Sequence, residues 1–204
     1  MKGLLLKDFY TLVKQMKLFL LMLVCFSLIP NLSVTSFAIV YAALLPVTAL
    51  AYDERSKWDR LAAMMPYSLR SLVLSKYLLG YAAVGGAALL SAAAQAAVGA
   101  VKGQPFAPES MAVLLAAVCV GALLLAVDLP FVFRMGVEKG RFIFLILTVL
   151  TAVASMTLRD WLAPLIETAG LHRTAAALCI ALFTVLANAV SAAVAVRQYA
   201  RRRR

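Results

Sequence analysis

Long apolar blocks separated by short polar segments make up almost the whole chain. The blocks lack the short alternating segments of a β-barrel, and a helix closes its backbone hydrogen bonds within one segment. The pattern predicts an all-α integral membrane protein, a single transmembrane domain over residues 1–204 with six transmembrane helices. The predicted spans are approximately residues 18–32, 37–51, 77–101, 111–133, 142–158 and 175–196.

Residues 1–17 have apolar and polar positions at helical spacing, which predicts an amphipathic amino-terminal helix in the headgroup plane. A cytoplasmic extension of the first span is the alternative. The apolar face comprises Leu5, Phe9, Leu12 and Met16, flanked by Leu6 and Val13, and the polar face comprises Lys7, Asp8, Thr11, Lys14 and Gln15.

Residues 52–76 form the long polar interruption between the second and third spans, with eight charged residues. Ser56 and Asp59 fit a capping box, and Asp53 and Glu54 are equally suitable caps or first-turn acids. These signals predict a short helix over about 56–65 that ends at Pro66. Its predicted apolar stripe consists of Trp58, Leu61, Ala62 and Met65.

Two destinations are open for this stripe. It lies on the membrane, where Trp58 suits the interface, or it enters a groove on another protein with Trp58 as the aromatic anchor. Acidic residues at the start of the helix favour the protein groove slightly, because anionic lipid repels them.

The distribution of basic residues predicts the orientation. Of the 20 lysines and arginines, 17 fall in residues 1–17, 52–76, 134–141 and 197–204, which predicts that both termini are cytoplasmic. This topology also accounts for the net charge of +11 without nucleic acid, and it makes the basic tail 197–204 a lipid anchor. Composition agrees, since 64% of residues are hydrophobic, 14% are charged and the mean hydropathy is +0.94.

Three polar residues within the spans are candidates for a substrate path. Gln95 is either a contact between helices or part of a path, and Asn188 is expected to be a packing contact. Asp128 lies near the cytoplasmic end of the fourth span, where a carboxylate is paired, hydrated or functional.

The sequence contains no motif for chemistry of its own. It has no GxxxxGK[ST] phosphate loop, no HExxH and no GxSxG, and its three cysteines are isolated within apolar blocks. We therefore expect no catalytic residue, no metal site and no bound cofactor. The energy for any transport would come from a partner.

Three segments resemble the membrane subunits of bacterial type-2 ABC exporters. They are MKGLLLKDFY, YDERSKWDRLAAMMPYSLRSLVLSKYLLG and LPFVFRMGVEKGR, and the likeness covers nearly the whole chain. The nearest subgroup is that of small six-span permeases that export peptides or confer resistance to peptide antibiotics. This resemblance implies a multi-pass protein of the bacterial cytoplasmic membrane.

The resemblance also implies a coupling helix after the second span, which seats in a cleft of a separate ATPase subunit. It assigns ATPase docking to Asp53, Glu54, Ser56, Trp58, Asp59, Leu61 and Met65. Two ATPase subunits, which bind ATP–Mg, and a second permease chain, identical or homologous, would complete the transporter. Alternating access would then export an amphipathic peptide or another hydrophobic substrate.

Two other functions are compatible with the sequence. One is a membrane scaffold or immunity protein that binds toxic peptides without pumping them. The other is a small secondary transporter or channel. The substrate, the identity of the second permease and the helices of a dimer interface are left open by the sequence.

Overall fold

The structure is a computed structural model, and it describes residues 2–29, 31–65, 67–103, 108–168 and 173–202. Some side chains within these ranges also lie outside this description, namely those of Lys2, Gln15, Leu32, Asp59, Ala63, Pro108, Glu109, Arg202 and residues 155–168 and 173–177. The described residues form helices and contain no strand. The helices are α1 (Lys2–Gln15), α2 (Lys17–Leu28), α3 (Leu32–Ala43), α4 (Leu45–Arg55), α5 (Trp58–Met64), α6 (Leu69–Val101), α7 (Pro108–Met135), α8 (Val137–Thr168) and α9 (Arg173–Arg202).

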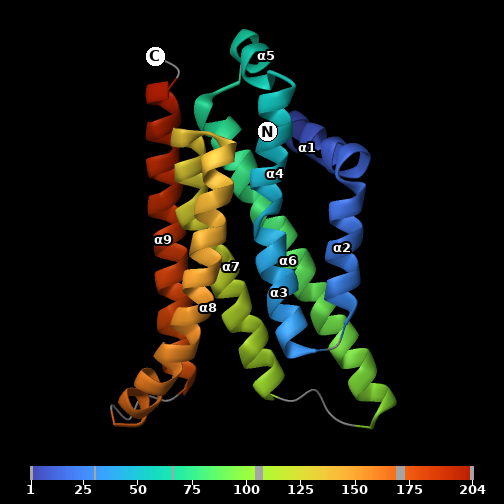
Figure 1. Cartoon of the computed structure of the whole chain (residues 1–204), viewed down its shortest axis with the longest axis vertical. Coiled ribbons are helices and arrows are strands. Elements are labelled where there is room, and N and C mark those ends of the chain that lie inside the picture. The colour runs from blue at the N-terminus through green and yellow to red at the C-terminus, as the bar shows by residue number, and fades with distance from the viewer. Residues whose placement is uncertain (1, 30, 66, 104–107, 169–172, 203–204) are drawn as a thin grey trace.

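Helix α7 is the central element of the bundle, since it packs against α3, α6, α8 and α9. Its residues Leu125 and Leu129 are fully buried, as are Ile39 of α3 and Val84 of α6. Figure 1 shows the long helices running along the long axis of the molecule, whereas α1 lies across it at one end. This arrangement is expected of a helical membrane domain whose core is formed by side chains of several spans.

Four helical segments of the described residues are long and apolar enough to cross a membrane: 33–55, 69–101, 110–135 and 178–201. A fifth is added if α1 and α2, which meet at 83°, form one span. An all-helical membrane architecture with four or five candidate spans is therefore shown, and the number six stays a prediction. The fifth predicted span falls within α8, whose later side chains lie outside the described residues.

The second predicted span is extended at both ends in the structure. Asn31 caps α3 by accepting a hydrogen bond from the Ser33 backbone N–H at 3.0 Å, so this helix begins before residue 37, the predicted start of the span. Only Leu44 interrupts it, one residue before α4, in which Pro46 occupies the first turn. Because α4 continues to Arg55, the first acidic residues of the polar stretch belong to the end of a span.

The amino-terminal helix is oriented differently from the prediction. Leu4, Leu12 and Met16 are buried against the bundle together with Asp8, which was expected on the polar outer face. A second set of large apolar side chains is exposed instead, namely Leu6, Phe9, Tyr10 and Val13. Asp8 tolerates burial because it pairs with a lysine of α6, described below. The prediction of a single apolar face was therefore wrong.

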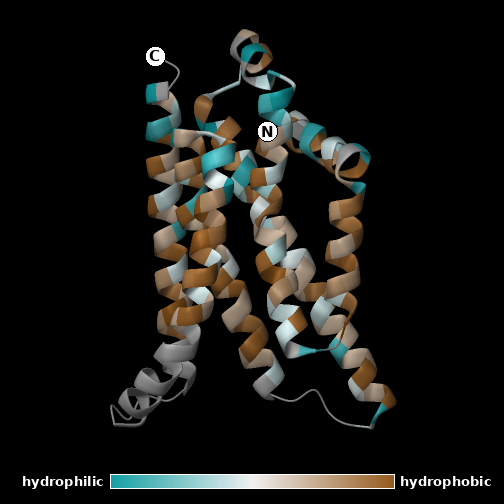
Figure 2. Cartoon of the chain, in the orientation of Figure 1, coloured by the Kyte–Doolittle hydropathy of each residue, from teal (hydrophilic) through white to brown (hydrophobic). Residues whose placement is uncertain are grey.

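Polar residues gather at the end of the molecule that carries α1, α5 and the last turns of α9 (Figure 2). The turn between α7 and α8 lies at this same end, and the α2–α3 connection lies at the opposite one (Figure 1). The described parts of the four basic segments therefore lie at one end, as the predicted topology requires. That this end faces the cytoplasm stays a prediction. Helix α9 continues through most of the basic tail, to Arg202.

Candidate docking site

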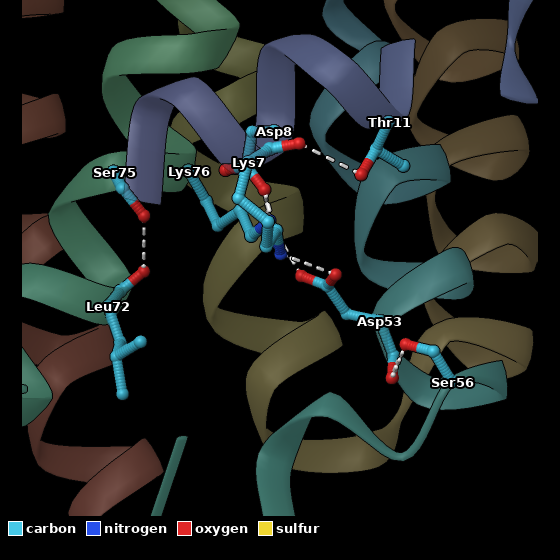
Figure 3. Close-up of polar contacts among 8 residues, drawn as sticks. All are labelled: Lys7, Asp8, Thr11, Asp53, Ser56, Leu72, Ser75 and Lys76. Carbon is cyan, nitrogen blue, oxygen red and sulfur yellow. Dashed lines mark hydrogen bonds and ion pairs between the residues drawn. The ribbon is translucent and has the colours of Figure 1, made fainter. Parts of the chain in front are cut away.

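Four charged side chains from three helices form a closed ring of ion pairs (Figure 3). Lys7 Nζ lies 2.9 Å from Asp8 Oδ1 and 2.6 Å from Asp53 Oδ1. Lys76 Nζ lies 2.7 Å from Asp8 Oδ1 and 2.7 Å from Asp53 Oδ2. Each residue of this ion ring contacts two residues of opposite charge. The ring therefore joins α1, α4 and α6.

Burial makes the ring sensitive to the loss of any one member. The exposed fractions of the side chains are 2% for Asp8, 6% for Lys76, 11% for Asp53 and 22% for Lys7. A buried charge is tolerated only when it is paired and hydrogen-bonded. Two cations and two anions in alternation leave no net charge in the ring, which explains how four ionised groups occupy an apolar bundle.

Lys7 extends the ring to α5. Its Nζ lies 4.5 Å from the centroid of the Trp58 ring, within the range of a cation–π contact. Burial lowers the pKa of the Lys7 ammonium, but its hydrogen bond and charge interaction with Asp53, with a smaller contribution from Asp8, raise the pKa above its ordinary value. Trp58 itself is half-buried and packs against the core.

A two-residue turn joins α4 to α5. The Ser56 hydroxyl donates to the Asp53 backbone carbonyl at 3.2 Å, and Lys57 has a φ of 53°. The left-handed conformation costs a non-glycine residue about 1–2 kcal/mol. Helix α5 begins at Trp58, and Lys57, which precedes it, forms no side-chain cap hydrogen bond. The Asp59 side chain of the predicted capping box lies outside the described residues. Ser56 closes α4 instead of opening α5.

The predicted stripe on α5 is divided between two faces. Ala62 is 1% exposed and, like Trp58, packs toward the bundle. Leu61 is 50% exposed, Met65 is 40% exposed and Met64, which the sequence analysis did not select, is 85% exposed. We call Leu61 and Met64, together with Met65 directly after the helix, the outer face of α5. The predicted helix stop, Pro66, lies outside the described residues, and α5 ends at Met64.

Glu54 is directed to another helix. Its Oε2 accepts from the Val137 backbone N–H at 3.4 Å, at the first residue of α8. A carboxylate is favourable there because the first backbone N–H groups of a helix have no intrahelical partner. Gly136, with a φ of 90°, makes the one-residue turn between α7 and α8. Glu54 therefore fastens α4 to α8, and it does not cap α5.

The docking residues predicted from the sequence thus take different positions. Asp53 belongs to the ion ring, Glu54 contacts α8, Ser56 closes α4 and Trp58 lies under Lys7. Leu61 and Met65 are exposed, whereas the side chain of Asp59 lies outside the described residues. Lys7, Asp8 and Lys76 also belong to this site, although the sequence did not predict them as members of it.

Asn188 forms contacts between the spans. Its Nδ2 donates to the carbonyls of Ala122 and Thr184 at 3.1 and 2.9 Å, and its Oδ1 accepts from Tyr81 at 2.7 Å. One turn further along α9, Ser191 forms hydrogen bonds with the Tyr77 hydroxyl and the Ala126 carbonyl. These contacts join α6, α7 and α9.

Gln95 and Asp128 differ in whether they have a partner. Gln95 Nε2 donates to Thr35 Oγ1 at 3.0 Å and so joins α6 to α3. Asp128 is 1% exposed, and neither of its carboxylate oxygens has a hydrogen-bond partner among the described residues. Within that part of the chain, no hydrogen bond links Gln95, Asp128 and Asn188 into one site. No group of three metal-ligating side chains is found there either.

A family model described as "ABC-2 family transporter protein" matches residues 3–200. The chain belongs to this family. Comparison with curated proteins found no match, and comparison with solved structures found none. Family membership makes the chain a membrane component of an ABC transporter and not an enzyme in itself. It also implies an ATPase partner in general terms.

Proposed function

We propose that the chain is the permease subunit of an ABC exporter and that α5 is its coupling helix. Two ATPase subunits that bind ATP–Mg and a second permease chain, identical or homologous, complete the transporter. ATP-driven movement of the ATPases exposes a path between the permeases to each side in turn, and an amphipathic peptide or another hydrophobic substrate leaves the cell. The outer face of α5 carries this proposal.

The position of α5 favours a protein partner over lipid. Helix α1 lies across the bundle with Leu6, Phe9, Tyr10 and Val13 exposed, as a helix at the membrane interface does. Helix α5 projects beyond α1 at the same end of the molecule (Figure 1). Its exposed apolar side chains therefore lie farther from the centre of the bundle than α1 does, beyond the plane in which α1 would contact lipid. An exposed apolar patch of this kind is typical of a protein interface.

The basic residues at this end support a cytoplasmic location for α5. The segments that gather there contain most of the lysines and arginines of the chain, and such segments stay on the cytoplasmic side. An ATPase must also be cytoplasmic to meet its nucleotide. We therefore place α5 and both termini in the cytoplasm, and the protein in the bacterial cytoplasmic membrane.

Substitutions on the outer face of α5 test the docking. Leu61→Asp combined with Met64→Asp should abolish copurification of the ATPase from membranes, because both side chains are exposed and would enter an apolar cleft. Ser33→Asp is the matched control, since Ser33 is exposed in the first turn of α3 at the opposite end. Undiminished association of the double variant, with normal insertion, would contradict the proposal.

Trp58→Ala and Asp59→Lys extend the same experiment. Trp58 supports α5 from below by its contact with Lys7, so Trp58→Ala should also reduce association. Transport in vesicles that contain the purified complex then separates the remaining functions. Export that requires ATP hydrolysis supports the permease, hydrolysis without substrate movement supports a scaffold, and transport driven by an ion gradient without ATP supports a secondary transporter.

A further inference from the structure

We propose that the ion ring transmits movement of the docked ATPase to α1 and α6, with Lys7, Asp8 and Lys76 as positioning residues. This inference rests on the proposed function, because it assumes that α5 is held by an ATPase. None of the three residues lies on α5 or in the predicted docking set. Their role would be to make α1, α4 and α6 move together when α5 moves.

The connection from α5 to the ring is short. Asp53 precedes Trp58 by five residues, and the Ser56 hydroxyl bonds to the Asp53 carbonyl in the intervening turn. Trp58 in turn contacts Lys7, which is a second member of the ion ring. Helix α5 is therefore attached to the ring both through the chain and through a side chain. A displacement of α5 reaches two ring members directly.

The ring itself resists partial opening. Moving α1 away from α6 separates Asp8 from Lys76, and moving α4 away separates Asp53 from both lysines. Either movement leaves buried charges without a partner, which is strongly unfavourable in a bundle of low polarity. Movement of the three helices as one unit keeps all four contacts. The ring thus favours concerted over independent movement.

Helix α6 carries the movement into the spans. It is continuous from Leu69 to Val101, and Tyr77 directly follows the ring residue Lys76. Tyr77 bonds to Ser191, and Tyr81 one turn later bonds to Asn188, so α6 is fastened to α9 just below the ring. The contacts run from α5 through the ring and α6 to α9 without interruption.

The same contacts would be present if the ion ring only stabilised the fold. A double substitution distinguishes that role from transmission of movement. Asp8→Asn combined with Lys76→Met removes one cation and one anion, so the pair Lys7–Asp53 stays electrically neutral. The outer face of α5 is untouched. We expect the double variant to insert and to copurify with the ATPase, but to move about tenfold less substrate per ATP hydrolysed.

Two controls keep stability and coupling apart. Lys76→Arg preserves the charge and should retain most of the transport per ATP. Gly80→Ala should lower stability through packing one turn below the ring, and its transport per ATP should be unchanged. A double variant that associates with the ATPase and transports with the normal ratio would overturn the inference. Absence of ATPase from the unaltered chain would contradict the proposed function instead.

A cross-link gives a second test that leaves the ring intact. Leu5 of α1 and Leu74 of α6 border the same apolar groove. In a variant without native cysteines, Leu5→Cys and Leu74→Cys can be joined by a short flexible bismaleimide. If the ring makes α1 and α6 move together, the cross-linked complex retains transport. Loss of transport on cross-linking, but not on modification of either single cysteine, would show independent movement and would overturn the inference.

Discussion

Among the side chains that the structure describes, carboxylates are buried at two sites, and they are paired at one site and unpaired at the other. In the ion ring, Asp8 and Asp53 each contact two lysines, whereas Asp128 is as deeply buried and has no hydrogen-bond partner among the described residues. A buried carboxylate that is paired with a lysine connects two helices, and this connection is lost when either partner is removed. A buried carboxylate without a partner provides no such connection. The difference predicts that charge matters for stability at one end of the bundle and much less in its interior.

Of the substitutions that test this comparison, removal of one ring charge should have the largest effect on the free energy of unfolding. Lys76→Met leaves Asp8 and Asp53 with one cation between them, and loss of one partner of a buried pair costs about 3–5 kcal/mol. Asp128→Leu should instead raise the free energy of unfolding by about 1 kcal/mol, because it removes an unpaired buried polar group. Denaturant unfolding in detergent measures both. Equal destabilisation by the two substitutions would contradict the proposed difference between paired and unpaired carboxylates.

Close packing below the ring should have the next largest effect. A Cβ added to Gly80 would lie 2.9 Å from Leu125 and from the rigid ring of Pro46, so Gly80→Ala should cost about 1–3 kcal/mol. Gly85 on the same helix has no neighbouring atom within 4 Å of such a Cβ. Gly85→Ala should therefore stabilise α6 by up to about 1 kcal/mol. If both alanine variants have the same stability, α6 is not held by close contact at Gly80.

Neutral hydrogen bonds between the spans should be weaker than the ring. Asn188→Leu removes three hydrogen bonds, and at about 0.6 kcal/mol for each such bond in a membrane the expected loss is about 2 kcal/mol. Gln95→Leu removes one bond and should cost about 0.6 kcal/mol. Thermal unfolding of the two variants in the same detergent gives the comparison. A larger loss for Gln95→Leu would show that Gln95 has a role beyond its contact with Thr35.

The pH dependence of the ring should be the smallest effect. The pKa of Lys7 in the folded protein is raised above the ordinary value of 10.5, so its stabilisation is complete below that pH and is lost as the pH rises through the folded-state pKa. Lys7→Arg should reduce this loss, because a guanidinium stays charged in the same range. Unfolding free energies at about pH 9 and about pH 12 measure it. An identical alkaline loss in the arginine variant would exclude Lys7 as its source.

Local signals in the sequence predicted much of the architecture. Long apolar blocks fell within the helices of the bundle, and the short helix after the second span is present as α5. Ser68 caps α6 by accepting a hydrogen bond from the Ser71 backbone N–H, and a serine just before a helical pattern is a recognisable start signal. These features depend on residues within a few positions of one another, and hydropathy and capping patterns report them directly.

The ion ring had no local signal. Lys7 and Asp53 are separated by 46 positions, and Asp8 and Lys76 by 68. Their contact depends on α1 folding back against α4 and α6, which no periodicity within residues 1–17 predicts. Acids and lysines near the ends of spans are common, and in isolation each is expected to reach water.

The start of α5 differs from the prediction for another reason. Ser56 and Asp59 satisfy the pattern, but the preceding helix continues through Asp53 to Arg55, and Ser56 then closes that helix. A seven-residue helix that starts two positions later turns Trp58 and Ala62 to the bundle and leaves Met64 outside. The division of the predicted stripe into two faces therefore depends on the turn at Lys57.

Cross-linking to the ATPase tests the central claim, that the outer face of α5 is the docking surface. In a chain whose Cys25, Cys119 and Cys179 are replaced by serine, Leu61→Cys is treated in native membranes with a heterobifunctional photo-cross-linker, and Ser33→Cys serves as the exposed control at the opposite end. We predict a product with the mass of permease plus ATPase from Leu61→Cys and none from Ser33→Cys. The same yield from both positions, or no product from Leu61→Cys while the ATPase copurifies, would contradict the account.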